Sequence, residues 1–176
     1  MKKLLFVPIF MTSLLASVPA LAMEGVGVIN MRDAVLGTQV AQDVLKALSE
    51  ETDYAANIEK ATLLQTERQA LAEKLQKDGE TLAQDEIVDI QRDIQEKGQE
   101  IEFIIGKVQA KQNQTIEKIF ADINPTLQKI LSELIAAKEV KLLLSQENVL
   151  FSDPALVLTD DVTSLLDVAL AEGQNE

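Results

Sequence analysis

The chain has 176 residues, a formal net charge of −13, and neither cysteine nor histidine. Such a negative charge disfavours binding to nucleic acid or to an anionic membrane surface, because both interactions need a positive field. Disulfides, thiol nucleophiles and the commonest general base are also excluded. We therefore expect a binding or structural protein, without catalytic residues, cofactor or metal.

The first 22 residues have the pattern of a secretory signal peptide. Lys2 and Lys3 precede an apolar run over residues 4–16, which is shorter than the ~20 residues that span a bilayer. Ala20 and Ala22 supply the small-x-small pattern before a cleavage site, and Met23 would begin the mature chain. We therefore expect export and cleavage after Ala22.

Residues 23–37 are expected to form the first part of a small body. Val26, Val28 and Ile29 indicate a short strand, and Met31 to Leu36 a helical turn.

Residues 38–124 predict a long helical hairpin, because only three glycines and no proline interrupt them. The first helix is expected over residues 38–78, where Lys77-Asp78-Gly79 is a typical stop signal with glycine at the C′ position. The tip is expected near residues 79–85, and acids at Asp85 and Glu86 favour a helix start. Each helix of about 40 residues would extend ~60 Å.

The second helix carries apolar residues that alternate by three and four positions, with Lys97 and Lys111 where apolar residues belong. One interpretation is that these lysines are solvated in a loose two-stranded coil. The other is that the arms are flexible and open, since Gly98 and Gly106 also weaken this helix. The two interpretations are compatible.

Residues 125–172 are expected to complete the body, and residues 173–176 to form a polar tail. Asn124-Pro125 predicts a kinked continuation or a new helix over residues 125–138. Two strands are expected, at residues 140–144 and 149–151, followed by a helix that starts at Thr159. The predicted core of the body, or of an oligomer, consists of Val26, Val28, Ile29, Leu127, Ile130, Leu131, Leu134, Val140, Leu142, Leu144 and Leu150.

The order of these parts resembles the Skp (OmpH-like) family of periplasmic chaperones. The segments that carry the resemblance are residues 26–31, 75–86, 140–144, 149–154 and 158–162. The resemblance implies an α+β fold shaped like a jellyfish: a homotrimer whose β-containing body carries three helical tentacles around a cavity. It also implies an ATP-independent holdase that binds unfolded outer-membrane proteins in the periplasm.

Client contacts would then be expected on the apolar stripe of the second helix. The expected contact residues are Ile87, Ile90, Ile94, Ile101, Ile104 and Val108. Well-known members of the family are basic, whereas residues 67–97 of this chain contain nine acids and five cations. We therefore expect client capture to depend on apolar contacts and shape. The alternative function is a periplasmic coiled-coil spacer or adaptor without chaperone activity.

Overall fold

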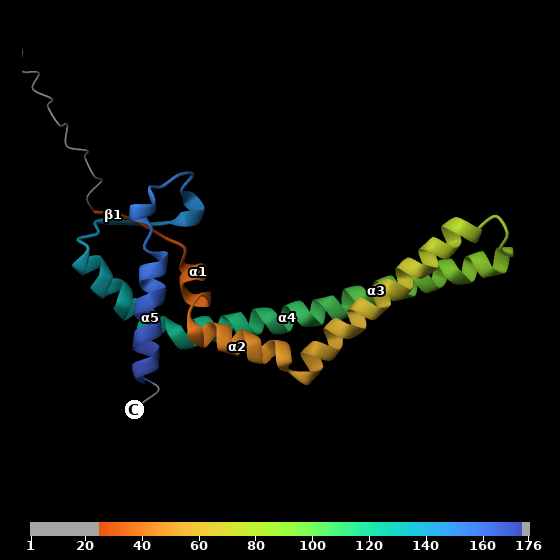
Figure 1. Cartoon of the computed structure of the whole chain (residues 1–176), viewed down its shortest axis with the longest axis horizontal. Coiled ribbons are helices and arrows are strands. Elements are labelled where there is room, and N and C mark those ends of the chain that lie inside the picture. Colours follow the sequence, from red (N-terminus) through yellow and green to blue (C-terminus); the bar gives the residue numbers. More distant parts are fainter. Residues whose placement is uncertain (1–24, 174–176) are drawn as a thin grey trace, which may run out of the picture.

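A small body and a long helical hairpin that projects from it make up the computed structural model (Figure 1). It describes residues 25–173. The expected signal segment, with Ala20, Ala22 and Met23, lies outside these residues, as does most of the expected polar tail. The predicted α+β class, with a helical hairpin on a small β-containing body, is confirmed.

The body contains one small parallel sheet. Strand β1 (Val26–Ile29) pairs with β2 (Leu142–Ser145), with Val26 opposite Leu142. On the other side of β1, Val28 forms an isolated bridge with Val157. The N–H of Leu158 donates to the carbonyl of Val28 at 2.8 Å. Both sides of β1 are therefore occupied by segments from the second half of the chain.

The prediction of a strand at residues 149–151 is wrong. The chain leaves β2 through a 3-10 helix, η1 (Gln146–Asn148), instead of a tight hairpin turn, so the segment is not returned alongside β2. A second 3-10 helix, η2 (Pro154–Leu156), follows it. Residues 125–172 thus contribute one strand to the described sheet, where two were expected.

Helix α5 (Thr159–Gly173) holds the start of the hairpin through polar residues spaced by four. The hydroxyl of Thr159 accepts a hydrogen bond from the N–H of Asn30 at 3.0 Å, and that of Thr163 donates to the carbonyl of Ala34 at 3.1 Å. Asp167 Oδ1 then accepts from the N–H of Gln39 at 2.7 Å. Because i, i+4 and i+8 lie on one helix face, α5 holds Asn30, Ala34 of α1 (Met31–Leu36) and Gln39 in a row.

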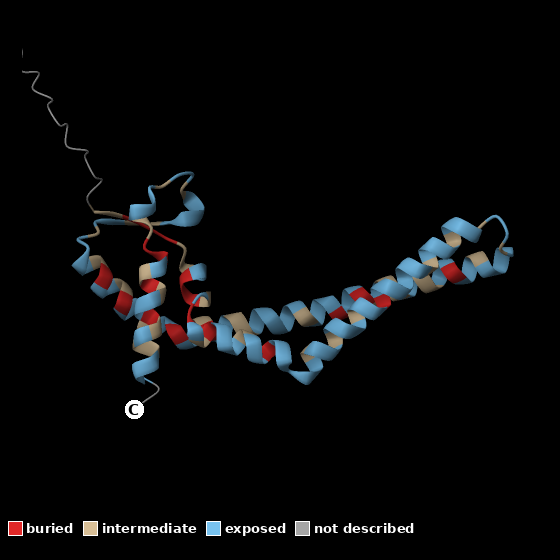
Figure 2. Cartoon of the chain, in the orientation of Figure 1, coloured by how far each residue is buried: buried red, intermediate tan, exposed pale blue. Residues whose placement is uncertain are grey.

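The main apolar core lies in the body, where α1, α4 (Gln84–Ala137) and α5 meet (Figure 2). Its central members, Val35, Val162 and Leu166, are fully buried. The end of α4 lines this core with Ile119, Ile123, Leu127, Ile130 and Leu134.

The first arm of the hairpin is two helices, where one was expected over residues 38–78. Helix α2 (Gln39–Glu50) ends at Glu51, whose φ of −62° and ψ of 125° are extended, and α3 (Thr52–Asp78) begins directly after it. Two glutamates at the negative end of α2, with no basic residue in its last turn, disfavour continuation of that helix. Thr52 and Asp53 suit a helix start instead. We call this break the elbow.

The second arm is one helix, α4, that passes through Pro125 without a break. Proline removes one helical hydrogen bond, but Ile123 and Leu127 on either side of it are both buried in the body core. This packing holds the helix together, and α4 changes direction where it enters the body (Figure 1). Of the two expected outcomes, the kinked continuation is therefore the observed one.

The tip comprises residues 79–83, between α3 and α4, slightly shorter than the expected 79–85. Gly79, expected at the C′ position, is the C-cap of α3 and has a right-handed φ of −56°. Glycine is needed there for space, because a Cβ atom would meet the carbonyl oxygen of Leu75. At the start of α4, Glu86 accepts a hydrogen bond from the N–H of Ala83 at 3.2 Å.

Candidate functional site

The hairpin is held by a narrow apolar seam between α3 and α4. Leu64 of α3 packs with Ile101 and Ile104 of α4, and Ala61 and Val108 border this cluster. Of the six expected client-contact residues, Ile101, Ile104 and Val108 belong to this seam. Ile90, Ile101 and Ile104 are buried, and Ile87, Ile94 and Val108 are half-buried. The three seam residues therefore pack against the first arm, and none of the six is fully exposed.

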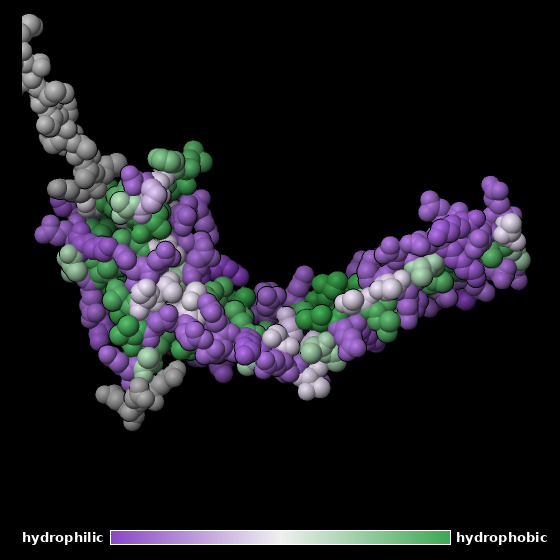
Figure 3. Space-filling model, in the orientation of Figure 1, coloured by the Kyte–Doolittle hydropathy of each residue, from purple (hydrophilic) through white to green (hydrophobic). Residues whose placement is uncertain are grey.

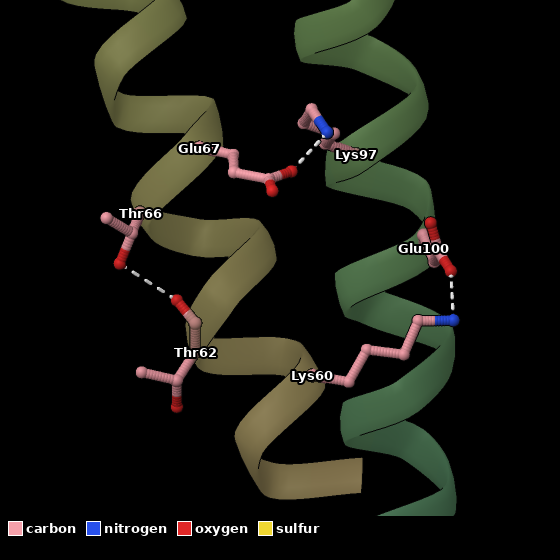
Figure 4. Close-up of polar contacts among 6 residues, drawn as sticks. All are labelled: Lys60, Thr62, Thr66, Glu67, Lys97 and Glu100. Carbon is pink, nitrogen blue, oxygen red and sulfur yellow. Dashed lines mark hydrogen bonds and ion pairs between the residues drawn. The ribbon is translucent and has the colours of Figure 1, made fainter. Parts of the chain in front are cut away.

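Three ion pairs cross the hairpin. Lys60 Nζ lies 2.6 Å from Glu100 Oε1, and Lys97 Nζ lies 2.5 Å from Glu67 Oε2 (Figure 4). Nearer the body, Lys111 Nζ lies 3.0 Å from Glu51 Oε1. Each pair joins the first arm to α4, so together they set the register in which the two arms pack.

The two lysines that interrupt the apolar pattern thus have acidic partners on the opposite arm. The hydrogen bond that Lys97 donates to the Glu67 carboxylate raises the pKa of Lys97, although partial desolvation opposes it. Lys97 is only 26% exposed, so its stem covers the seam while its ammonium group pairs at the edge. The lysines belong to the packing of the hairpin.

The elbow opens a groove between α2 and α4. It has a volume of about 590 Å³. It is lined from α2 by Val44, Ala47, Leu48 and Glu50, at the elbow by Glu51, and from α4 by the polar residues Lys111, Gln114, Thr115 and Lys118. A recess of about 100 Å³ adjoins it toward the body, lined by Val40, Val44, Lys118, Ile119, Asp122 and Ile123. We call these two spaces together the elbow groove.

The charge of α4 changes sign along its length. Residues 84–102 contain the acids Asp85, Glu86, Asp89, Asp93, Glu96, Glu100 and Glu102, and the cations Arg92 and Lys97. Residues 103–118 contain three lysines, at 107, 111 and 118, and one acid, Glu117. The distal arm is accordingly hydrophilic over most of the surface seen in Figure 3. The acidic character predicted for residues 67–97 belongs to the tip half, and the part of α4 beside the elbow is basic.

Several large apolar side chains on the arms are exposed outside the seam. Phe103 is 64% exposed, with Lys107 Nζ 4.6 Å from its ring centre, and Leu63 is 57% exposed. The others on α3 and α4 are Ile58, Val88 and Ile105. None of these five is among the expected client-contact residues. Val88, Phe103 and Ile105 each lie one position away from the three-four stripe of α4, and this offset distinguishes them from the seam residues.

The residues predicted for the body core divide into three groups. Val28, Ile29, Leu127, Ile130 and Leu134 are buried, and Val26, Leu131, Val140 and Leu144 are half-buried. Leu142, by contrast, is 51% exposed and Leu150 is fully exposed, next to Phe151 at 87%. The loop after β2, at the top of the body in Figure 1, accordingly presents apolar atoms in Figure 3.

Residues 25–173 contain no group of three or more acidic, histidine or cysteine side chains arranged to hold a metal ion. Across the same residues, no helix is both long and apolar enough to cross a membrane.

Comparisons with known proteins place the chain in a family. A family model described as Outer membrane protein (OmpH-like) matches residues 25–166. No curated protein matches the chain. Among solved structures, it is similar to a candidate outer membrane chaperone (OmpH-like) from Caulobacter crescentus, with 25% sequence identity, 84% of this chain and 86% of that chain covered, and a TM-score of 0.47.

Proposed function

The chain belongs to the OmpH-like family, and we propose that it is an ATP-independent holdase that binds unfolded outer-membrane β-barrel proteins and prevents their aggregation. Family members of the chaperone type act in the periplasm, which agrees with the export signal expected at the start of the sequence. The proposed location is therefore the periplasm, after cleavage behind Ala22.

The observation that carries this proposal is the exposed surface of the hairpin. The arms present single apolar side chains, such as Leu63, Val88 and Phe103, between charged residues over the length of two long helices. An unfolded polypeptide meets such a surface through many weak contacts. Their sum gives useful affinity, while each contact breaks easily on release. This arrangement suits transient holding of an extended client.

The proposal includes a homotrimer built through the body. A two-stranded sheet is marginal alone, and the exposed Leu142 lies on the strand at its edge. Leu150 and Phe151 add exposed apolar surface on the following loop. Symmetric association would cover these residues, and the resemblance to the family supplies the number three.

The test uses the mature chain, residues 23–176. Light scattering gives its mass in solution, and a urea-unfolded β-barrel protein is diluted into buffer with and without it, in the absence of nucleotide. We expect a trimer that suppresses client turbidity in proportion to its concentration, whereas an equal mass of serum albumin does not. A stable oligomer that leaves turbidity unchanged would favour the spacer or adaptor function instead.

A further inference from the structure

One face of α4 carries acids in its distal half and lysines in its proximal half. Its residues follow one another at intervals of three or four, so they form a single stripe along the helix. All of them are exposed or half-buried. In chain order they are Asp89, Asp93, Glu96, Glu100, Phe103, Lys107, Lys111, Gln114 and Lys118. We call this set the charged stripe.

The charged stripe is complementary to a reversed copy of itself. Reversal about the point between residues 103 and 104 sets every lysine opposite an acid: Lys107 opposite Glu100, Lys111 opposite Glu96, and Lys118 opposite Asp89. Gln114 falls opposite Asp93, and Phe103 lies next to the point of reversal. The complementary pattern runs along α4 from near its start to the residue before Ile119, where the helix joins the body core.

The distal half of the stripe keeps an excess of negative charge within one chain. Its four acids have two cationic partners, Arg92 and Lys60. Arg92 Nη2 lies 2.8 Å from Asp89 Oδ1, and Lys60 Nζ lies 2.6 Å from Glu100 Oε1. Both ion pairs are well exposed, so the carboxylates remain accessible to a second partner.

The proximal half keeps lysines that a partner can reach. Lys111 pairs with Glu51 of the first arm, and Lys107 Nζ lies 4.6 Å from the centre of the Phe103 ring. Lys118 is exposed, and no hydrogen bond or ion pair joins its side chain to another residue within 25–173.

Other acids weaken the positive half without belonging to the stripe. Glu50 lines the elbow groove beside Lys118, and Asp53 lines a neighbouring space with Lys107. On α4 itself, the same reversal sets Asp85 opposite Asp122 at the outer ends. The long-range field of the proximal half is therefore small. Attraction depends instead on direct contact between two stripes in one register, within the range that salt does not screen.

We propose that the charged stripe is an interface between two copies of the chain, whose hairpins pack antiparallel with Phe103 beside the two-fold axis. Each acid–lysine pair then forms twice, as in any two-fold interface, against two contacts between Asp85 and Asp122. Phe103, which is 64% exposed in the single chain, packs against the ring of its counterpart.

The paired copies belong to two different bodies. Hairpins that project from one body by cyclic symmetry run parallel, which sets like charges of the stripe side by side. The arm interface is therefore separate from the body interface of the proposed trimer. It also does not depend on holdase activity.

Reversal of one end of the stripe at a time gives a complementation test. In Asp89→Lys, two copies set lysine against Lys118 at both ends, and in Lys118→Glu they set glutamate against Asp89. Each variant alone should therefore raise the Kd of arm pairing about three- to tenfold. When the two variants are mixed, each new charge meets its opposite, so the mixed pair should regain the Kd of the wild type.

Equilibrium sedimentation of the mature chain at low salt measures this Kd, and circular dichroism checks that helicity is unchanged. Lys74→Glu is the matched control, because it makes the same charge change as Lys118→Glu on an exposed part of α3. It should alter the Kd less than about twofold, and its mixture with Asp89→Lys should restore nothing. A mixture of Asp89→Lys and Lys118→Glu that pairs no better than either variant alone would overturn the proposal.

Cysteine cross-linking detects the arm contact itself, whatever the body does, because the chain has no other cysteine. Asp93→Cys and Gln114→Cys lie opposite one another in the proposed pair and take no part in its acid–lysine contacts. With a short bismaleimide, we expect cross-linked dimers in an equal mixture of these two variants and few in either variant alone. Parallel arms would instead link each variant to itself, and that result, or no link between positions 93 and 114, would also overturn the proposal.

Discussion

Lys97 Nζ lies 2.5 Å from Glu67 Oε2, across the hairpin and between two helices that are otherwise joined by a thin apolar seam. A polar residue at a seam position costs stability but restricts the register in which two helices can pack. The ion pairs of Lys60 and Lys111 also cross the hairpin, and both lie closer to the body than this one. The three pairs explain how a seam with few buried residues selects a single register.

The pairing of Lys97 predicts that the hairpin loses stability at high pH. Its pKa is raised above the usual value of 10.5 in the folded state, so its contribution is complete below that value and is lost as the pH rises through the raised pKa. Urea unfolding followed by circular dichroism from pH 8 to pH 11 measures this loss. The decrease in the free energy of unfolding above pH 10.5 should be smaller in Lys97→Met than in the wild type. A decrease of the same size in both proteins would contradict the assignment of this effect to Lys97.

The elbow predicts that proline is tolerated at position 52. Glu51 already has the extended conformation that a following proline favours, and Thr52 is the first residue of α3, where proline suits a helix. Thr52→Pro should leave helicity unchanged and stabilise the chain by up to about 1 kcal/mol, because it restricts the unfolded state.

Ala56→Pro, four residues further into α3, is the matched control. It removes an interior helical hydrogen bond and should cost about 3 kcal/mol or more in the free energy of unfolding, measured in urea. Similar losses from both substitutions would indicate a continuous helix from residue 38 to residue 78 and no elbow.

The ion pair of Lys97 and the elbow show which parts of the structure the sequence could predict and which it could not. Periodicity identified the hairpin and the seam of α4, because apolar spacing reflects local helix packing, and the stop signal at Gly79 identified the tip. The elbow lacks glycine and proline, and its cause is an unfavourable charge at the end of α2, which apolar spacing does not record. The segment 149–151 has strand-like residues, but pairing depends on a partner strand that local sequence does not specify. Lys97 and Lys111 were identified as unusual, yet their acidic partners depend on the register of the hairpin.

Glycine substitutions should separate helix propensity from close packing. Gly106 lies within α4, and a Cβ atom there would meet nothing within 4 Å, so Gly106→Ala should stabilise the chain by about 0.5–1 kcal/mol. Gly27 lies in β1, where a Cβ atom would come within 2.7 Å of Leu158 Cδ1 and 3.2 Å of Leu143 Cδ1. Gly27→Ala should therefore destabilise the body by about 1–3 kcal/mol. Urea midpoints that shift in the same direction for both variants would contradict this distinction.

The exposed loop residues predict a change in oligomeric mass without a change in fold. Leu150 and Phe151 have almost no contact with the rest of their own chain, so Leu150→Glu combined with Phe151→Glu should leave helicity unchanged. In the proposed trimer, each copy would bring charged side chains into an apolar interface, and burial of unpaired charge is strongly unfavourable. We expect light scattering to report a shift toward the monomer at micromolar concentration.

Leu63→Glu, an equally conspicuous apolar-to-acidic change on the arm, is the control and should retain the mass of the wild type. A double variant that also retains that mass would place the interface elsewhere on the body, because charge at these two positions can disturb only contacts made beyond the single chain.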